Sequence, residues 1–124
     1  MLDPQNFSVN AGNSTDVYID IDPDDGITLV GSQIYWRAYE QALGQPMAGT
    51  DPVIEKDNGD GGTIVVTDPD IQKLKVPLEP SDTADLLRNY YHEATVIDPN
   101  GNVVTVAIGI MTVMGTEYRA AATT

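Results

Sequence analysis

His92 is the only histidine in the chain, and histidine is the side chain best suited to moving protons near neutral pH. Nucleophilic hydrolysis would also need a serine or cysteine within hydrogen-bond reach of the imidazole, and a third group to orient the ring. The chain has no cysteine, and no serine and carboxylate can be matched to His92 from the sequence. A zinc site would need further histidine or cysteine ligands. We therefore interpret His92 as a half-exposed histidine of a β-strand, and we predict no catalytic residue and no enzyme activity.

A cluster of acidic residues at positions 20–26, Asp-Ile-Asp-Pro-Asp-Asp-Gly, invites comparison with calcium-binding loops. An EF-hand loop has acids at positions 1, 3 and 5, glycine at position 6 and glutamate at position 12. Counted from Asp20, position 6 is Asp25 and position 12 is Gly31, so the pattern fails. We predict an acidic turn in water, with a looser Ca²⁺ site between loops as the alternative, because hard cations accept irregular sets of oxygen ligands. No metal ligand and no cofactor are assigned.

Two further patterns lack what their chemistry requires. Residues 57–62 are rich in glycine, but they contain no lysine and no helical pattern follows them, which excludes a phosphate-binding loop. Nineteen acidic residues offer many carboxylate pairs for glycoside cleavage, but the separation that defines such a pair is a property of the fold. A flexible hairpin tip and a solvated acidic surface are the simpler interpretations.

Short segments of alternating apolar and polar residues must position these side chains, and their period of two is that of β-strands. Trp36 shares one strand face with Ile34 and Ala38, so we expect it to anchor the core. Tyr90 and Tyr91 point to opposite faces of one strand, so we expect one inside and the other at the surface. The expected strands are residues 7–9, 17–21, 33–40, 53–56, 63–67, 72–78, 90–97 and 102–114.

Turn signals separate these strands. Residues 98–101, Asp-Pro-Asn-Gly, predict a hairpin turn, because asparagine followed by glycine suits the backbone of such turns. Residues 41–52 are expected to form a loop, and residues 80–87 are the one helical candidate, with Ser81 as its N-cap. Pro77 has no N–H to donate and is expected at a sheet edge or a strand end. Seven or eight strands with one short helix before the last hairpin predict an all-β, immunoglobulin-like β-sandwich.

Composition restricts the partners and the location. Nineteen Asp and Glu against six Lys and Arg give a net charge of −13, which disfavours nucleic acid as a partner because phosphate neutralisation needs clustered bases. The N-terminus lacks the basic and apolar segments of a signal peptide, and the longest apolar stretch, 103–114, is shorter than the ~20 residues of a membrane helix. We expect a soluble protein made in the cytoplasm, with no membrane partner. The predicted domain, 15–115, follows an N-terminal arm with the first strand (1–14) and precedes a C-terminal tail (116–124).

The strand edges and turns between residues 15 and 114 form an ordered set of short motifs. They are Ile34-Tyr35-Trp36-Arg37, Val53-Ile54-Glu55-Lys56, Gly62-Thr63-Ile64-Val65-Val66-Thr67-Asp68, Leu78-Glu79-Pro80-Ser81-Asp82-Thr83-Ala84-Asp85-Leu86, Tyr91-His92-Glu93-Ala94, Asp98-Pro99-Asn100-Gly101 and Gly109-Ile110-Met111-Thr112-Val113. In this order they resemble a widespread group of small tailed-bacteriophage proteins, often encoded near head and head–tail genes. They are also similar to the immunoglobulin-like N-terminal domain of phage upper baseplate proteins.

The resemblance implies a non-enzymatic β-sandwich that is a structural part of the virion, decorating the head or forming part of the head–tail neck. It implies capsid, neck or tail proteins as partners and a homo-oligomer in the particle, and it transfers no binding residue. One alternative is a baseplate or tail adaptor. Another is a carbohydrate- or cell-surface-binding module in which Tyr35, Tyr39 and one of Tyr90 or Tyr91 stack on sugar rings. A hydrolase has the least support, because no acid–base or nucleophile set is recognisable.

Overall fold

The computed structural model is a sandwich of two β-sheets and describes residues 4–21, 29, 31–47, 49–59, 62–68, 73–86 and 88–115. The strands are β1 (Phe7–Asn10), β2 (Thr15–Asp20), β3 (Gln33–Ala42), β4 (Gln45–Pro46), β5 (Ile54–Asp57), β6 (Val65–Asp68), β7 (Lys73–Leu78), β8 (Asn89–Ile97) and β9 (Val103–Met114). One short helix, α1 (Pro80–Thr83), lies between β7 and β8. The all-β sandwich with a short helix before the last hairpin is confirmed.

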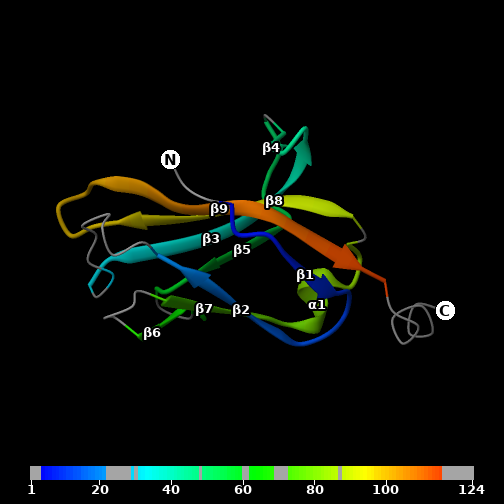
Figure 1. The fold of residues 1–124 in the computed structure, drawn as a ribbon. Helices are drawn as coiled ribbons and strands as arrows, with labels where there is room; N and C mark the ends of the chain where they lie inside the picture. The colour runs from blue at the N-terminus through cyan, green and yellow to red at the C-terminus, as the bar shows by residue number, and fades with distance from the viewer. Residues whose placement is uncertain are drawn as a thin grey trace.

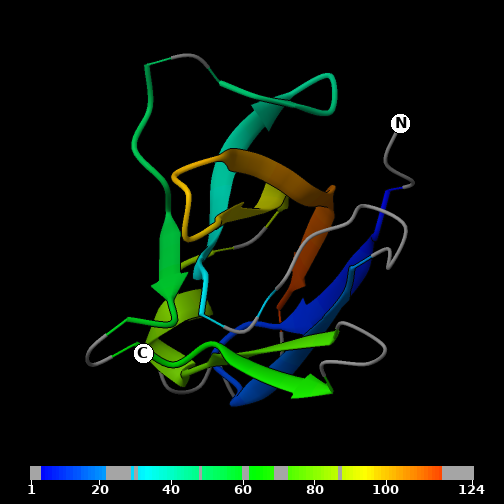
Figure 2. The same ribbon diagram turned by 90° about the vertical axis from the view of Figure 1, so that its left-hand side faces the viewer.

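The strand order is that of an immunoglobulin-like sandwich. The larger sheet runs β1-β9-β8-β3-β4, with β5 also paired to β3, and the smaller sheet runs β2-β7-β6. These orders reproduce the G-F-C and B-E-D arrangements of immunoglobulin domains. The first strand lies parallel to β9 at the edge of the larger sheet. Figures 1 and 2 show the two sheets as separate layers, with the β3–β4 hairpin projecting away from both.

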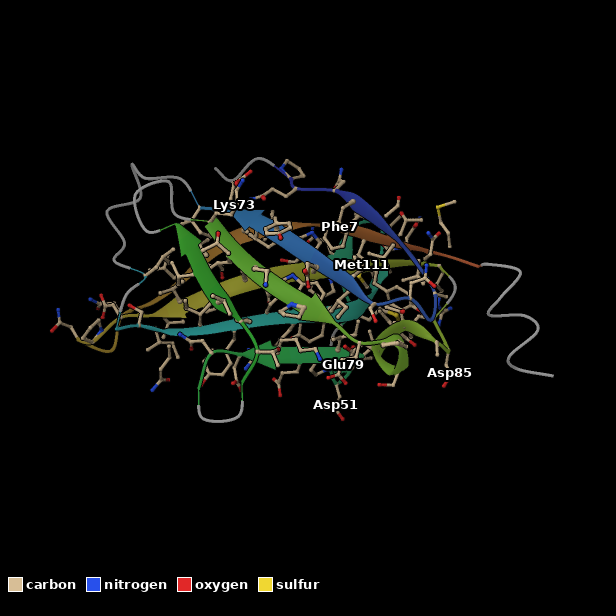
Figure 3. All side chains as sticks on the ribbon, turned by 90° about the horizontal axis from the view of Figure 1, so that it is seen from below. Phe7, Asp51, Lys73, Glu79, Asp85 and Met111 are labelled. Carbon is tan, nitrogen blue, oxygen red and sulfur yellow. The ribbon has the colours of Figure 1, made fainter. Side chains whose placement is uncertain are left out.

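Alternating side chains fill the space between the sheets. Ile34, Trp36 and Ala38 point inward from β3 and are fully buried, so the expectation that Trp36 anchors the core is confirmed. The smaller sheet contributes alternate residues of β2 and β7, and Figure 3 looks onto this sheet with the core side chains behind it. The buried residues from these two strands are Val17, Ile19, Leu74, Val76 and Leu78.

His92 has a position on β8 comparable to that of one disulfide cysteine of antibody domains. In those domains a buried tryptophan on strand C packs against the disulfide, whose second cysteine follows a tyrosine by two residues on strand F. Here Trp36 is buried on β3, and His92 follows Tyr90 by two residues on β8. The chain has no cysteine, and the Trp36 Nε1–H donates a hydrogen bond of 3.2 Å to His92 Nδ1.

The helix begins differently from the prediction. Its N-cap is Glu79 and not Ser81, which lies inside α1. The Glu79 N–H donates to Asp82 Oδ2 over 2.7 Å, and Lys56 Nζ lies 2.8 Å from the same oxygen. Pro80 at the first helical position explains the shift, because its missing N–H and preset φ suit that position and place the cap one residue earlier.

Part of the loop predicted at residues 41–52 is β-strand. β3 continues to Ala42, and β4 pairs back onto it through Ala42 with Gln45 and Gln41 with Pro46. Pro77 lies on the central strand of the smaller sheet, but β6 pairs only with residues 73–75 of β7, so the proline lies beyond that partner and next to the strand end. Residues 22–26 of the predicted acidic turn and the tail from residue 116 onward lie outside the described residues. No helix in the described ranges is long and apolar enough to cross a membrane.

Candidate interaction surface

His92 is sealed inside the protein, and the prediction of a half-exposed histidine is wrong. Its side chain has no exposed surface, and the ring centroid of Phe7 lies 4.9 Å away. The reason is the N-terminal segment, which lies beside β9 at Ile108 and Gly109 and places the Gln5 carbonyl oxygen 2.6 Å from His92 Nε2. Reaching a substrate would require this segment to leave, so the geometry gives His92 a structural role.

The hydrogen bonds of His92 also define its protonation. The Gln5 carbonyl can only accept, so Nε2 carries the proton and Nδ1 accepts from the Trp36 indole. A second proton would set a donor on Nδ1 against the indole N–H. Burial lowers the pKa of His92 below its usual 6.5, and the bond to Gln5 offsets only part of this effect. The imidazole is therefore neutral in the folded protein.

Gln5 links the two sheets by hydrogen bonds to β9 and β2, a role that the sequence did not indicate. Its backbone N–H donates to the Ile108 carbonyl of β9 over 2.8 Å. Its side chain pairs with the backbone of Asp20 on β2, donating to the carbonyl oxygen over 2.7 Å and accepting from the N–H over 2.9 Å. Gly109 makes this crossing possible, because a Cβ there would overlap the Gln5 carbonyl and lie 2.7 Å from His92 Nε2. A glycine inside a strand is the available sequence signal for such a close approach.

The acidic segment is only partly placed. The Asp20 carboxylate is mostly exposed and lies 3.7 Å from Lys73 Nζ, while residues 22–28, which hold the other acids of the segment, are outside the described ranges. Among the described residues, no group of three or more His, Asp or Glu side chains is arranged to bind a metal ion.

The beginning of the glycine-rich segment 57–62 has a structural role, because the Asn58 side chain bonds to the backbone at the start of β3. Asn58 Oδ1 accepts from the Ile34 N–H over 2.8 Å, and its amide donates to the Ser32 carbonyl over 2.9 Å.

Both tyrosines of β8 are buried, which corrects the prediction that one remains at the surface. Tyr90 lies in the core, and Tyr91 on the opposite face retains 9% of its surface. Tyr91 is covered because its ring packs against Tyr39, at 6.5 Å between centroids, and because the β3–β4 hairpin contacts β8. Burial, together with the neighbouring Glu93 carboxylate, raises the pKa of Tyr91 to about 12.

The β3–β4 hairpin displays an apolar side chain at its tip. Leu43 is fully exposed, and its φ of 56° is the only positive value at a non-glycine among the residues that the structure describes. Gly44 follows with φ 80°, and its N–H is held by Gln41 Oε1 at 2.8 Å. A left-handed leucine costs about 1–2 kcal/mol. Residues 41–50 contain no charged side chain in a protein of net charge −13.

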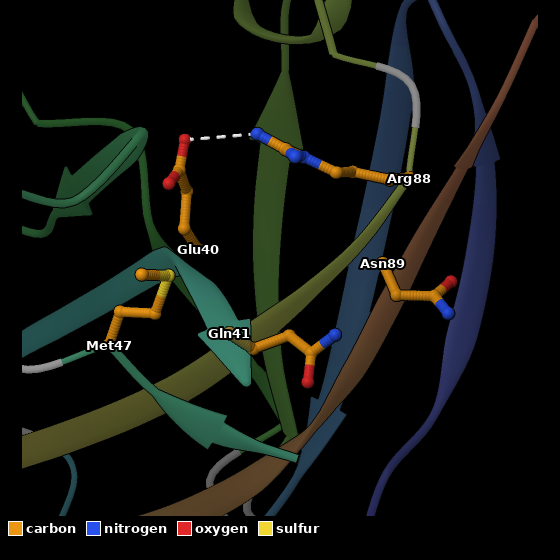
Figure 4. A pocket seen from close by; sticks show the side chains of 5 residues that line it. All are labelled: Glu40, Gln41, Met47, Arg88 and Asn89. Carbon is orange, nitrogen blue, oxygen red and sulfur yellow. Dashed lines mark hydrogen bonds and ion pairs between the residues drawn. The ribbon is translucent and has the colours of Figure 1, made fainter. Parts of the chain in front are cut away.

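Two hollows flank this hairpin. One, of about 350 Å³, has a mainly apolar lining in which Leu43, Tyr91, Ile108 and Ile110 take part. The other, of about 170 Å³, is polar and is crossed by the ion pair between Arg88 and Glu40, 3.1 Å long (Figure 4). We define the interaction surface as the hairpin tip together with the larger, apolar hollow.

The strain at the hairpin tip leads to a prediction about stability. Leu43→Asn creates an Asn-Gly step that favours two positive φ values, and the leucine side chain that it replaces is fully exposed. We expect urea unfolding of the isolated protein to show a gain of about 1 kcal/mol. Ala42→Asn is the matched control, because Ala42 is an exposed β3 residue without a positive φ. A gain no larger than that of the control would contradict the strained turn.

No protein-family model matches the chain, and no curated protein is similar to it in sequence.

Proposed function

We propose that this chain is a non-enzymatic structural protein of a tailed phage particle, where it decorates the head or forms part of the head–tail neck together with further copies of itself. The observation that carries the proposal is the hairpin tip, where a fully exposed leucine is held in a strained backbone beside an apolar hollow. A strained backbone at Leu43 with an apolar hollow beside it supports a role in binding another protein. The resemblance of the strand edges and turns to small tailed-phage proteins supplies the kind of particle.

The chemistry of the described residues supports a binding role over catalysis. His92, the only histidine, is neutral, buried and hydrogen-bonded on both ring nitrogens. The outer face of the larger sheet carries paired charges, with Arg37 Nε 2.6 Å from Glu55 Oε2. Capsid, neck or tail proteins are the proposed partners, and the virion is the proposed location.

Purified particles test this proposal. Mass spectrometry of the virion should detect the chain in many copies per particle, and its absence from purified virions would defeat the proposal. The hairpin is tested by complementation with Leu43→Asn, which should fold normally but enter the particle less. Val65→Asn is the matched control, because Val65 is an exposed apolar residue on β6 at 48% of its surface. Equal incorporation of the two variants would remove the hairpin from the interface.

The structure favours the sugar-binding alternative less than the sequence did. Tyr35 and Tyr39 are only half-exposed, and the Arg37 guanidinium covers the Tyr35 ring at 4.8 Å from its centroid. Stacking on sugar needs a free ring face, and Tyr91 is also covered. A baseplate or tail position within the particle is the remaining alternative, and labelling of particles with an antibody against the chain would distinguish it from the head and neck.

A further inference from the structure

The β8–β9 hairpin has a free edge on its β9 side. β9 pairs with β8 from Val103 to Thr112, but β1 covers its other side only from Met111 to Met114. Gln5 extends this cover to the Ile108 carbonyl. The beginning of β9 therefore has a neighbour on one side only, within the part of the chain that the structure describes.

The hairpin turn shows which backbone groups face the free side. The Asp98 N–H donates to the Asn102 carbonyl, so these two residues form a hydrogen-bonded pair. Pairs alternate along an antiparallel ladder, so Val104 bonds to β8, and Val103 and Thr105 direct their N–H and C=O groups outward. No described residue bonds to these outward groups. Beyond Thr105 the register shifts, and Val106 and Ala107 are both buried.

The exposed side chains of this edge are apolar or neutral. Val103 retains 66% of its surface and Val104 39%, and Thr105 is exposed. Residues 99–116 are the longest stretch of the chain without a charged side chain. Strand edges of soluble proteins usually carry charges, especially lysine, that prevent pairing with other chains. This edge has no such protection.

Charge determines which occupant fits. Two copies that each carry a net charge of −13 repel one another over most of their surfaces, and an uncharged edge is where they can meet without facing acids. The nearest charge in sequence, Asp98, accepts hydrogen bonds from Asn100 and Asn102 within its own turn. Asp51, Glu79 and Asp85 lie toward the end of the molecule that carries α1, away from this hairpin (Figures 1 and 3). Asp20 lies nearer to β9, since Gln5 bonds to its backbone and to Ile108, and its carboxylate is 3.7 Å from Lys73 Nζ.

We propose that the free edge of β9 pairs with the same edge of a second copy, antiparallel, about a two-fold axis through Val104. Val103 of each copy then faces Thr105 of the other, so every outward N–H and C=O of these two residues has a partner. Val104 faces its own equivalent in a pair without hydrogen bonds, where side chains come closest. Because only three residues pair, the contact is weak alone and becomes strong when a particle holds copies side by side.

Single cysteine variants test the register, since the native chain has no cysteine. Across a pair without hydrogen bonds the Cα atoms lie about 4.5 Å apart, inside the range of about 4.4–6.8 Å that disulfides span. On mild oxidation, Val104→Cys should form dimers at least about tenfold faster than Val65→Cys, because pairing raises the effective concentration of its thiol. A mixture of Val103→Cys with Thr105→Cys should cross-link faster than either alone.

Equal oxidation rates of Val104→Cys and Val65→Cys would overturn the proposal. So would faster cross-linking of Val103→Cys alone than of its mixture with Thr105→Cys. Sedimentation equilibrium gives a second measurement, in which Val103→Lys should weaken self-association at least about tenfold, as lysines on edge strands do. Lysine lowers the net negative charge and reduces general repulsion, so a weaker association would reflect the edge itself. The strengthening in a particle rests on the proposed function, but the pairing itself is measured on the isolated chain, so its failure would leave the detection of the chain in virions unaffected.

Discussion

Gly109→Ala will lower the free energy of unfolding by about 3 kcal/mol, the upper end of the cost of overpacking a tight interior. The added Cβ would overlap the Gln5 carbonyl and crowd His92 Nε2. Because the carbonyl belongs to the backbone, the clash is relieved only if the N-terminal segment moves away from β9. That movement would also break the bonds from Gln5 to Ile108 and to Asp20. Urea unfolding followed by tryptophan fluorescence measures the loss, since the single Trp36 lies next to the affected histidine.

Gly59→Ala is the matched control for this substitution. Gly59 has no positive φ, and a Cβ there would meet Asp57 Oδ1 at 3.6 Å, an ordinary contact. We expect its effect to stay within about 0.5 kcal/mol, as is usual for surface substitutions. If Gly109→Ala cost no more than this control, the N-terminal segment would not be seated on β9 as described.

Acid will destabilise the protein through His92. The pKa of His92 in the folded state lies below the unfolded value of 6.5, because the ring is buried. The unfolded state therefore binds the proton first as the pH falls. The contribution of neutral His92 to the free energy of unfolding is fully present above about pH 6.5. It declines below that pH, by at most about 1.4 kcal/mol per pH unit, until the pKa of the folded state is reached. The ordinary pKa values of Asp and Glu side chains are about 4, so the window just below pH 6.5 is that of the histidine.

His92→Gln separates this effect from other titrations. A glutamine carries both a donor and an acceptor, so it can replace the bonds to Gln5 and Trp36 without a titrating group. We expect its free energy of unfolding to change less between about pH 6.5 and pH 5 than that of the native chain, because one proton-linked difference is gone. The single histidine also permits a direct observation, because its NMR resonance should not titrate near 6.5 while the protein is folded. A normal titration with retained structure would contradict the sealed site.

The predictions for Gly109 and for His92 concern the same contact, in which Gln5 of the N-terminal segment lies against β9 and β8. Because Gly109 has no side chain, the Gln5 carbonyl can lie against it, and this carbonyl accepts a hydrogen bond from His92 Nε2. The Trp36 indole completes the set from the neighbouring strand. A buried polar set of this kind is stable when all its members are satisfied and costly when one is lost, since a buried unpaired polar group costs about 1–3 kcal/mol. The sandwich thus has a hydrogen-bonded histidine at the place on β8 that is comparable to one cysteine of the antibody disulfide.

Local pattern was sufficient for most elements. Alternation over two residues placed the strands within a few residues of their observed bounds, and it selected the inward face of β3 correctly. The hairpin at residues 98–101 followed from its turn residues, and Gly101 has the expected positive φ of 88°. The Ser81 cap was wrong by two residues. The β3–β4 hairpin was missed because Leu43-Gly44 lacks the usual asparagine or aspartate of such turns.

The sequence by itself determined which side chains of each strand share a face, because the pleat of a β-strand alternates whatever surrounds it. It also determined the charge of the chain and the absence of cysteine. Only the tertiary structure decided which of the polar and aromatic residues are covered. His92 is sealed by Gln5, which lies 87 positions away, and Tyr91 by Tyr39 and a hairpin from another strand. Burial depends on which distant segment crosses a residue, and alternation along one strand carries no information about that crossing.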